Sequence, residues 1–198
     1  MTSITPSAQT ADTARALTAN ISLIQDEITE TLAGVDKHQL ATLAAHVEDA
    51  KRIFIAGAGR SGLVLRMAAM RLMHLGLTVH VAGDTTTPAI AAGDLLIVAS
   101  GSGTTSGTVK SAETAANVDA RIAAITTNRS SPLALLADVV IEVPAAQKTD
   151  HSSSATSQYS GSLFEQALFL ATESVFQTLW ESAEEPAEQL WLRHANLE

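Results

Sequence analysis

The chain has 198 residues, of which 46% are hydrophobic and 17% charged, and its formal net charge at pH 7 is -9. This composition indicates a globular domain with a substantial core, and the negative charge disfavours nucleic acid and anionic membranes as partners. The chain has no cysteine, which excludes disulfides, thiolate catalysis and cysteine-ligated zinc. No apolar run is long enough for a membrane span and no signal peptide is recognisable, so we expect a cytoplasmic protein.

The first fifty residues predict two helices. Residues 1–12 are expected to be a flexible terminus, and residues 13–198 a single domain. Apolar residues then recur at helical spacing from Leu17 to Leu32, which predicts a long amphipathic helix that ends near Gly34. Asp36 with Gln39 resembles a capping box and predicts the start of a second helix.

A regular alternation of strands and helices follows and predicts an α/β fold. Short apolar runs that end in glycine-, serine- or threonine-rich turns predict five strands, at residues 52–56, 78–82, 95–99, 121–126 and 139–143. The run Leu95–Ala99 does not alternate with polar residues, which is typical of a strand buried on both faces of a parallel sheet.

The turn after this buried strand is the strongest candidate for a ligand site. It reads Ser-Gly-Ser-Gly-Thr-Thr, from Ser100 to Thr105, and a helix is predicted over residues 108–117. Hydroxyls and backbone N–H groups at the start of a helix favour a phosphate. The alternative is an ordinary turn whose hydroxyls only cap the helix. The turn lacks the lysine of a P-loop and the glycine spacing of a dinucleotide site.

A second glycine-rich turn follows the first predicted strand. Gly57, Gly59 and Gly62 have the spacing of a dinucleotide fingerprint, but a single match of this kind is weak. Loops at the carboxyl ends of parallel strands meet in one crevice, so we expect this turn to face the Ser100–Thr105 turn. Arg60 could contact an anionic ligand there or be a solvated turn residue.

A long polar stretch after Pro144 reaches Gly161, and loops of this length are often functional. Ser162 is then expected to cap an apolar helix. Glu165 stands three residues later, which fits a capping box and also fits a carboxylate base at the mouth of the crevice.

Three histidines need comment. His74 falls on an apolar helix face and is expected to be a partly buried structural residue. Asp150 and His151 resemble a metal pair only if the absence of further ligands is ignored. His194 lies in a polar tail near the C-terminus, where a fixed histidine would be unusual.

Taken together, these stretches resemble the 6-phospho-3-hexuloisomerases, a family of sugar isomerase (SIS) domains. The similarity runs in order from about residue 20 to the end and is carried by the Ser100–Thr105 turn together with residues 57–62, 70–76, 85–88, 161–165 and 193–197.

The resemblance implies a single SIS domain with a five-stranded parallel sheet flanked by helices, in a homo-oligomer that is a dimer or a tetramer. It implies interconversion of D-arabino-3-hexulose 6-phosphate and D-fructose 6-phosphate, in the ribulose monophosphate pathway, with functional coupling to 3-hexulose-6-phosphate synthase. No cofactor or metal is expected. Glu165 matches the family's proton acceptor, and we expect His194 to enter a neighbouring subunit's site. The expected substrate-binding residues are Gly57, Gly59, Arg60, Ser61, Ser100, Gly101, Ser102, Gly103, Thr104 and Thr105.

The sequence departs from the family at one position, and two alternative functions remain open. Many SIS domains carry glutamate where this chain has Thr104, so no acid–base role is expected at that position. The alternatives are a phosphosugar-binding regulator without catalysis and an arabinose 5-phosphate isomerase. The acidic charge and the absence of an appended DNA-binding motif argue against the regulator, and the absence of extra regulatory domains argues against the second isomerase.

Overall fold

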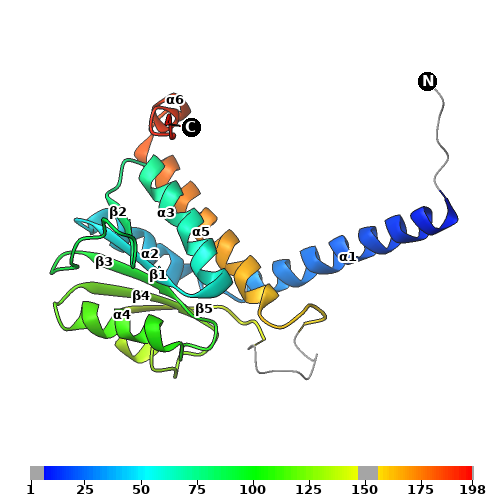
Figure 1. Ribbon diagram of the computed structural model, residues 1–198, viewed down its shortest axis with the longest axis horizontal. Helices are drawn as coiled ribbons and strands as arrows, with labels where there is room; N and C mark the ends of the chain where they lie inside the picture. Colours follow the sequence, from blue (N-terminus) through cyan, green and yellow to red (C-terminus); the bar gives the residue numbers. More distant parts are fainter. Residues whose placement is uncertain (1–6, 147–155, 198) are drawn as a thin grey trace.

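The computed structural model describes residues 7–146 and 156–197, and within them five parallel strands form one sheet in the order β2-β1-β3-β4-β5 (Figure 1). In chain order the elements are α1 (Ala8–Ala33), α2 (Lys37–Asp49), β1 (Ile53–Gly57), α3 (Gly59–His74), β2 (Val79–Val81), β3 (Leu95–Ala99), α4 (Ser106–Ala116), β4 (Arg121–Thr126), the 3-10 helix η1 (Ala134–Leu136), β5 (Val139–Glu142), α5 (Ser162–Ala183) and α6 (Ala187–Trp191).

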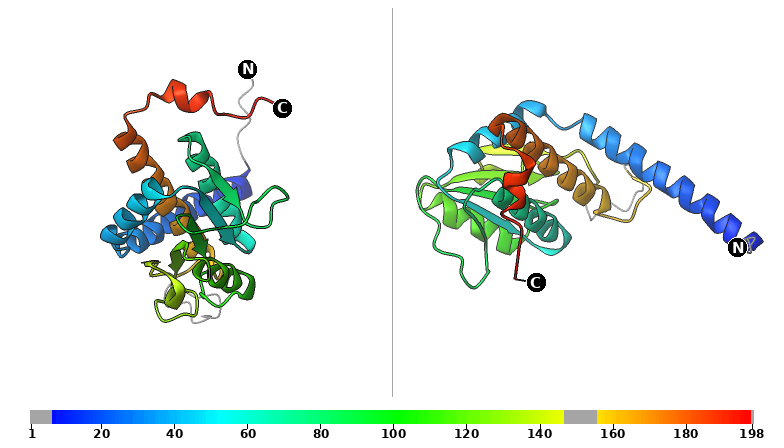
Figure 2. Two further views of the ribbon diagram at one scale, coloured as in Figure 1. Left: turned by 90° about the vertical axis from the view of Figure 1, so that its left-hand side faces the viewer. Right: turned by 90° about the horizontal axis from the view of Figure 1, so that it is seen from above.

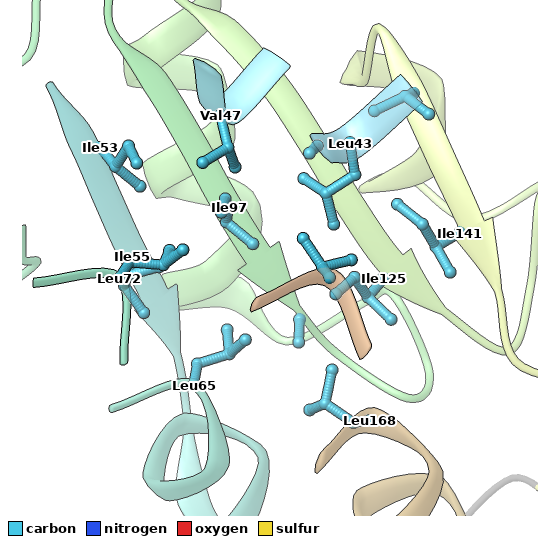
Figure 3. Close-up of a cluster of buried hydrophobic side chains, with 14 of the residues drawn as sticks. Leu43, Val47, Ile53, Ile55, Leu65, Leu72, Ile97, Ile125, Ile141 and Leu168 are labelled. Carbon is cyan, nitrogen blue, oxygen red and sulfur yellow. The ribbon is translucent and has the colours of Figure 1, made fainter. Parts of the chain in front are cut away.

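Helices cover both faces of the sheet, which confirms the expected three-layer α/β architecture. Alternate strand residues Ile53, Ile55, Ile97, Ile125 and Ile141 point to one face, where they pack against α2, α3 and α5 (Figure 3). The other residues of the same strands point to the opposite face and pack beneath α4 and η1. Because β3 lies in the middle of the sheet, all five of its side chains are buried, which is why its sequence does not alternate.

The N-terminal helix begins earlier than the sequence analysis expected. The side chain of Ser7 caps α1 by accepting a hydrogen bond from the Thr10 N–H, so the helix starts at Ala8 and not after residue 12. Figures 1 and 2 show α1 extending far beyond the rest of the domain. Asp36 caps α2 as expected, through a hydrogen bond from the His38 N–H.

The C-terminal residues form a helical tail, also as expected. The last turn of α5 is followed by α6, and both views in Figure 2 show the tail leaving the far end of α5. Within the described residues, no helix is long and apolar enough to cross a membrane.

Candidate functional site

The site forms between β1 and β3, where the order in which the chain adds strands to the sheet reverses. β1 pairs with β3 in parallel, with Gly57 opposite Ala99, so the turns after these strands begin side by side. The helices that follow them leave in opposite directions, α3 over one face and α4 over the other (Figure 1). Open α/β sheets bind ligands in the crevice at such a switch point, and the two predicted turns both face it.

The turn after β1 is held tightly by its glycines. A Cβ at Gly62 would lie 2.5 Å from the carbonyl oxygen of Gly57, so the strand and the first turn of α3 touch through bare backbone. Gly59 has φ of 57°, a left-handed conformation that favours glycine. This geometry sets the first turn of α3, which carries Arg60 outward and Ser61 inward, with Ser61 buried.

The turn after β3 gathers the predicted hydroxyls. Ser100 and Thr105 Oγ atoms lie 3.0 Å apart, and the Oγ of Ser102 accepts a hydrogen bond from the Thr104 hydroxyl at 2.9 Å. Thr105 is the N-cap of α4, but among the described residues it makes no side-chain hydrogen bond to the first turn of that helix. The hydroxyls therefore turn toward one another, and the start of α4 has donors to offer an anion.

The glycines of this turn fix its shape. Gly103 has φ of 66°, and a Cβ there would collide with the side chain of Ser131. The carbonyl of Gly101 accepts hydrogen bonds from the Thr127 N–H and hydroxyl, at 3.0 and 2.8 Å. A Cβ at Gly101 would also lie 3.4 Å from the ring of Phe164, which brings this turn against the start of α5.

Glu165 completes the site from α5. Its side chain is only 4% exposed, and its Oε2 lies 2.7 Å from Nε of Arg60. A second nitrogen of Arg60 donates to the Ser162 hydroxyl at 3.4 Å. A buried carboxylate in the first turn of a helix, beside two loops rich in donors, is a good candidate for an acid–base group.

These contacts correct one detail of the sequence analysis and add a partner for Arg60. The N-cap of α5 is Gly161, with φ of 85°, and not Ser162; within the described residues it makes no side-chain cap bond, so the capping box with Glu165 is wrong. With Gly161 as its N-cap, the helix starts one residue earlier than expected. Arg60, for which the sequence left two interpretations open, pairs with Glu165, and 58% of its side chain remains exposed.

His194 does not reach this site within its own chain. Its ring stacks on that of His74, with centroids 4.1 Å apart, and Trp191 packs beside it. His74 ends α3, about 20 Å along the helix from Arg60 at its start. Arg193 fixes the tail there by donating to the carbonyl of His74 and to both carboxylate oxygens of Glu185.

The histidine at the end of α3 is buried, as expected for a structural residue. Burial lowers the pKa of His74, and the nearby charges of His194 and Arg71 lower it further. Asp150 and His151 lie outside the described residues. Among the described residues, no three side chains of the His, Cys, Asp and Glu types cluster in a way that could hold a metal ion.

The sequence analysis missed one residue connected to the site. Glu27, on α1, accepts hydrogen bonds from residues 156–158, which lie a few residues before α5. A single glutamate on a mostly exposed helix gives no sequence signal, because its partners lie about 130 residues further along the chain.

The chain is similar to a known protein family and to curated proteins. Residues 46–171 match the SIS domain family. The chain is 69% identical over 182 residues to the 3-hexulose-6-phosphate isomerase of Mycobacterium gastri, covering 92% of each chain. It is 38% identical to the 3-hexulose-6-phosphate isomerase of Bacillus subtilis strain 168, covering 91% of this chain and 98% of that protein.

The fold is also found in solved structures. A hypothetical protein from Methanococcus jannaschii, for which a function of 3-hexulose-6-phosphate isomerase was inferred, superposes with a TM-score of 0.79. It is 30% identical in sequence, and the superposition covers 91% of this chain and 99% of that one.

Proposed function

Because the chain belongs to the SIS domain family, and within it to the 3-hexulose-6-phosphate isomerases, we propose that it interconverts D-arabino-3-hexulose 6-phosphate and D-fructose 6-phosphate. The observation that carries the proposal is the buried carboxylate of Glu165, 2.7 Å from Arg60 and beside two glycine-rich turns that we assign to the phosphosugar. The protein is thus an isomerase, and its chemistry follows from these residues.

Glu165 acts as the base. Moving the carbonyl from C3 to C2 requires removal of the proton on C2, formation of an enediolate, and delivery of a proton to C3; the hydroxyl proton passes from O2 to O3. One carboxylate can serve both carbons, because they are adjacent. The base needs a fixed position, and burial in the first turn of α5 gives Glu165 one.

The phosphate binds at the turn after β3. We assign Ser100, Ser102 and Thr105 as hydroxyl donors, with Gly101, Gly103 and Thr104 supplying the shape of the turn. The Ser100 and Thr105 hydroxyls bond each other, and the Ser102 hydroxyl accepts a bond from that of Thr104; such bonds are readily exchanged for stronger ones to a charged phosphate. The start of α4 adds a favourable dipole.

The sugar lies toward the turn after β1. Gly57 and Gly59 allow its backbone to come close, while Arg60 and Ser61 are placed to stabilise the negative charge that develops on O2 and O3. Arg60 suits this task because its side chain is 58% exposed while it contacts Glu165. The reaction needs a base and oxyanion donors, so we infer that no cofactor is required.

We further propose that the active form is a homo-oligomer in which His194 enters a neighbouring subunit's site. Along α3, four apolar side chains form an exposed stripe: Leu63, Met67, Met70 and Met73. Two copies paired antiparallel along this stripe, about a two-fold axis, would bring the His74 end of one α3 to the Arg60 end of the other. His194, stacked on His74, would then lie beside the partner's Glu165.

Mixing inactive variants tests this arrangement. Glu165→Gln and His194→Ala are each expected to be inactive or nearly so alone. If His194 acts in trans, a mixed dimer has one site with both native residues, and mixing the unfolded variants and refolding them together should restore about a quarter of native activity. No recovery in a confirmed dimer would place His194 outside the partner's site.

A coupled assay separates the proposed reaction from the alternatives. The protein is given D-arabino-3-hexulose 6-phosphate and the appearance of D-fructose 6-phosphate is followed, with arabinose 5-phosphate as a second substrate. We expect turnover of the hexulose phosphate only. Turnover of arabinose 5-phosphate alone would favour the second isomerase, and binding without turnover would favour a regulator.

The 3-ketose product of an aldol addition of formaldehyde to ribulose 5-phosphate is the substrate that this reaction consumes. We therefore keep functional coupling to 3-hexulose-6-phosphate synthase, and a cytoplasmic location, as predictions. Adding that synthase with formaldehyde and ribulose 5-phosphate to the assay should sustain formation of D-fructose 6-phosphate.

A further inference from the structure

Glu27 is the centre of a hydrogen-bond cluster between α1 and the segment before α5. Its Oε2 accepts from the Thr156 hydroxyl at 2.7 Å and from Nε2 of Gln158 at 2.9 Å, and its Oε1 accepts from the Ser157 N–H at 2.6 Å. Three donors converge on one carboxylate, and bonds of this charge-assisted kind are short and strong.

The cluster continues into the helix that carries the base. Gln158 accepts a hydrogen bond from Nε2 of Gln166 at 2.8 Å, and Gln166 is the residue after Glu165. The Ser162 N–H bonds the carbonyl of Tyr159 at 3.1 Å, which ties the same segment to the first residue of α5. An unbroken chain of contacts therefore runs from Glu27 to the first turn of α5.

The first turn of α5 needs such support. Its N-cap is Gly161, which has no side chain that could accept a capping hydrogen bond. Burial alone would raise the pKa of Glu27, but the hydrogen bonds from Ser157, Gln158 and Thr156 outweigh it and hold the pKa below its ordinary value. The carboxylate is therefore charged across the neutral range, and the cluster persists there.

We propose that Glu27 is a positioning residue for the reaction: it holds residues 156–158 in place and thereby fixes Glu165 and its pair with Arg60. This inference rests on the proposed function, because it gives Glu165 the role of base. In this proposal α1, which precedes every strand of the sheet, positions a residue of α5, near the other end of the chain.

Glu27→Gln tests the inference, since the amide keeps the size of the side chain but loses the charge and presents a donor to the Gln158 donor. Small displacements of a reacting group cost up to about 10²-fold in rate, so we expect kcat to fall by roughly 10- to 100-fold. KM should change by less than about threefold, because Ser100 and Ser102 on the other turn hold the phosphate. Glu30→Gln, which removes an exposed charge one turn further along α1, is the matched control and should leave kcat unchanged.

A swap provides the readout that general destabilisation would not give. In Glu27→Gln with Gln158→Glu, the amide at 27 donates to the carboxylate at 158, which still accepts from Gln166. We expect this double variant to recover most of kcat, whereas each single variant stays low. A Glu27→Gln enzyme with kcat within twofold of Glu30→Gln, or a double variant no better than either single one, would overturn the inference.

Hydrogen exchange separates this failure from failure of the proposed function. The Ser157 N–H is bonded to Glu27, so its exchange should be at least tenfold faster in Glu27→Gln than in the native protein or in Glu30→Gln. If the native protein exchanged as expected but formed no D-fructose 6-phosphate, the proposed reaction would fail. Unchanged exchange in Glu27→Gln would instead refute the role of Glu27, whatever the activity.

Discussion

The two ends of the α3–α5 helix pair hold the same ion pair in different surroundings. At one end Arg60 meets Glu165, and at the other Arg193 meets Glu185; each pair has a closest N–O distance of 2.7 Å. Glu165 is 4% exposed and faces two turns rich in donors, whereas Glu185 is 23% exposed and lies against the C-terminal tail. Burial and neighbours, and not residue type, separate the carboxylate that we propose as the base from the structural one.

The sharpest test of this contrast replaces each carboxylate by its amide. Glu165→Gln should lower kcat by about 10²–10⁴-fold, the usual loss when a general base is removed, with little change in KM. Glu185→Gln, at the equivalent pair, should leave kcat near the native value. Steady-state kinetics and melting curves on both variants decide the matter: near-normal kcat in Glu165→Gln with a lowered melting temperature would make Glu165 a structural residue.

The tail end of the helix pair gives the next largest effect. Deletion of residues 194–198 should lower kcat by about 10²-fold if His194 transfers a proton in a neighbouring site. Thermal stability should change little, because Arg193 and its bonds to Glu185 and His74 remain. Deletion of residues 196–198 alone is the control. Native activity in the longer truncation would refute a catalytic role for His194.

A smaller effect is expected at the phosphate turn. Ser102→Ala should raise KM for D-fructose 6-phosphate by roughly tenfold or more, since a hydrogen bond to a charged group contributes about 1.5–3 kcal/mol. Ser111→Ala, on the same side of the sheet in α4, removes a hydroxyl that bonds only the carbonyl of Gly107 among the described residues and serves as the control. Equal KM values in the two variants would move the phosphate to another place.

The smallest expected effect is a pH dependence of stability at the tail end of the helix pair, where His74 and His194 stack. Burial lowers the pKa of His74 in the folded protein, with His194 and Arg71 adding to it, so the unfolded chain binds protons first. The stability that neutral His74 contributes is complete above its pKa in the unfolded chain, about 6.5. It is lost as the pH falls through the lower pKa of His74 in the folded protein. The drop in melting temperature between pH 7.5 and pH 5.5 should therefore be larger for the native protein than for His194→Ala. Parallel curves would exclude coupling between the two rings.

Much of the fold could be predicted because each strand is locally marked. Leu95–Ala99 and Arg121–Thr126 lie at the residues expected, since uninterrupted apolar runs followed by glycine or polar turns leave little choice. The two turns were identified as one crevice for the same reason, since parallel strands place their following loops at one edge.

The contacts within the site could not be predicted in the same way. Gly161 starts α5 through a left-handed backbone that its neighbours in sequence do not reveal, and the pairing of Glu165 with Arg60 joins residues about a hundred positions apart. The stacking of His194 on His74 also depends on how the tail folds back, and no local pattern encodes it.

The bond between Glu27 and Ser157 has a consequence for synthesis on the ribosome. Its partners are separated by 130 residues, and translation adds about 5–20 residues per second, so Glu27 waits roughly 6–26 s for the segment that it binds. Until then the nascent chain can form α1, α2 and most of the sheet, but α5, with the proposed base Glu165, has not yet been made. Chains arrested before α5 are therefore expected to be inactive, and the protein is expected to become active only when translation is nearly complete.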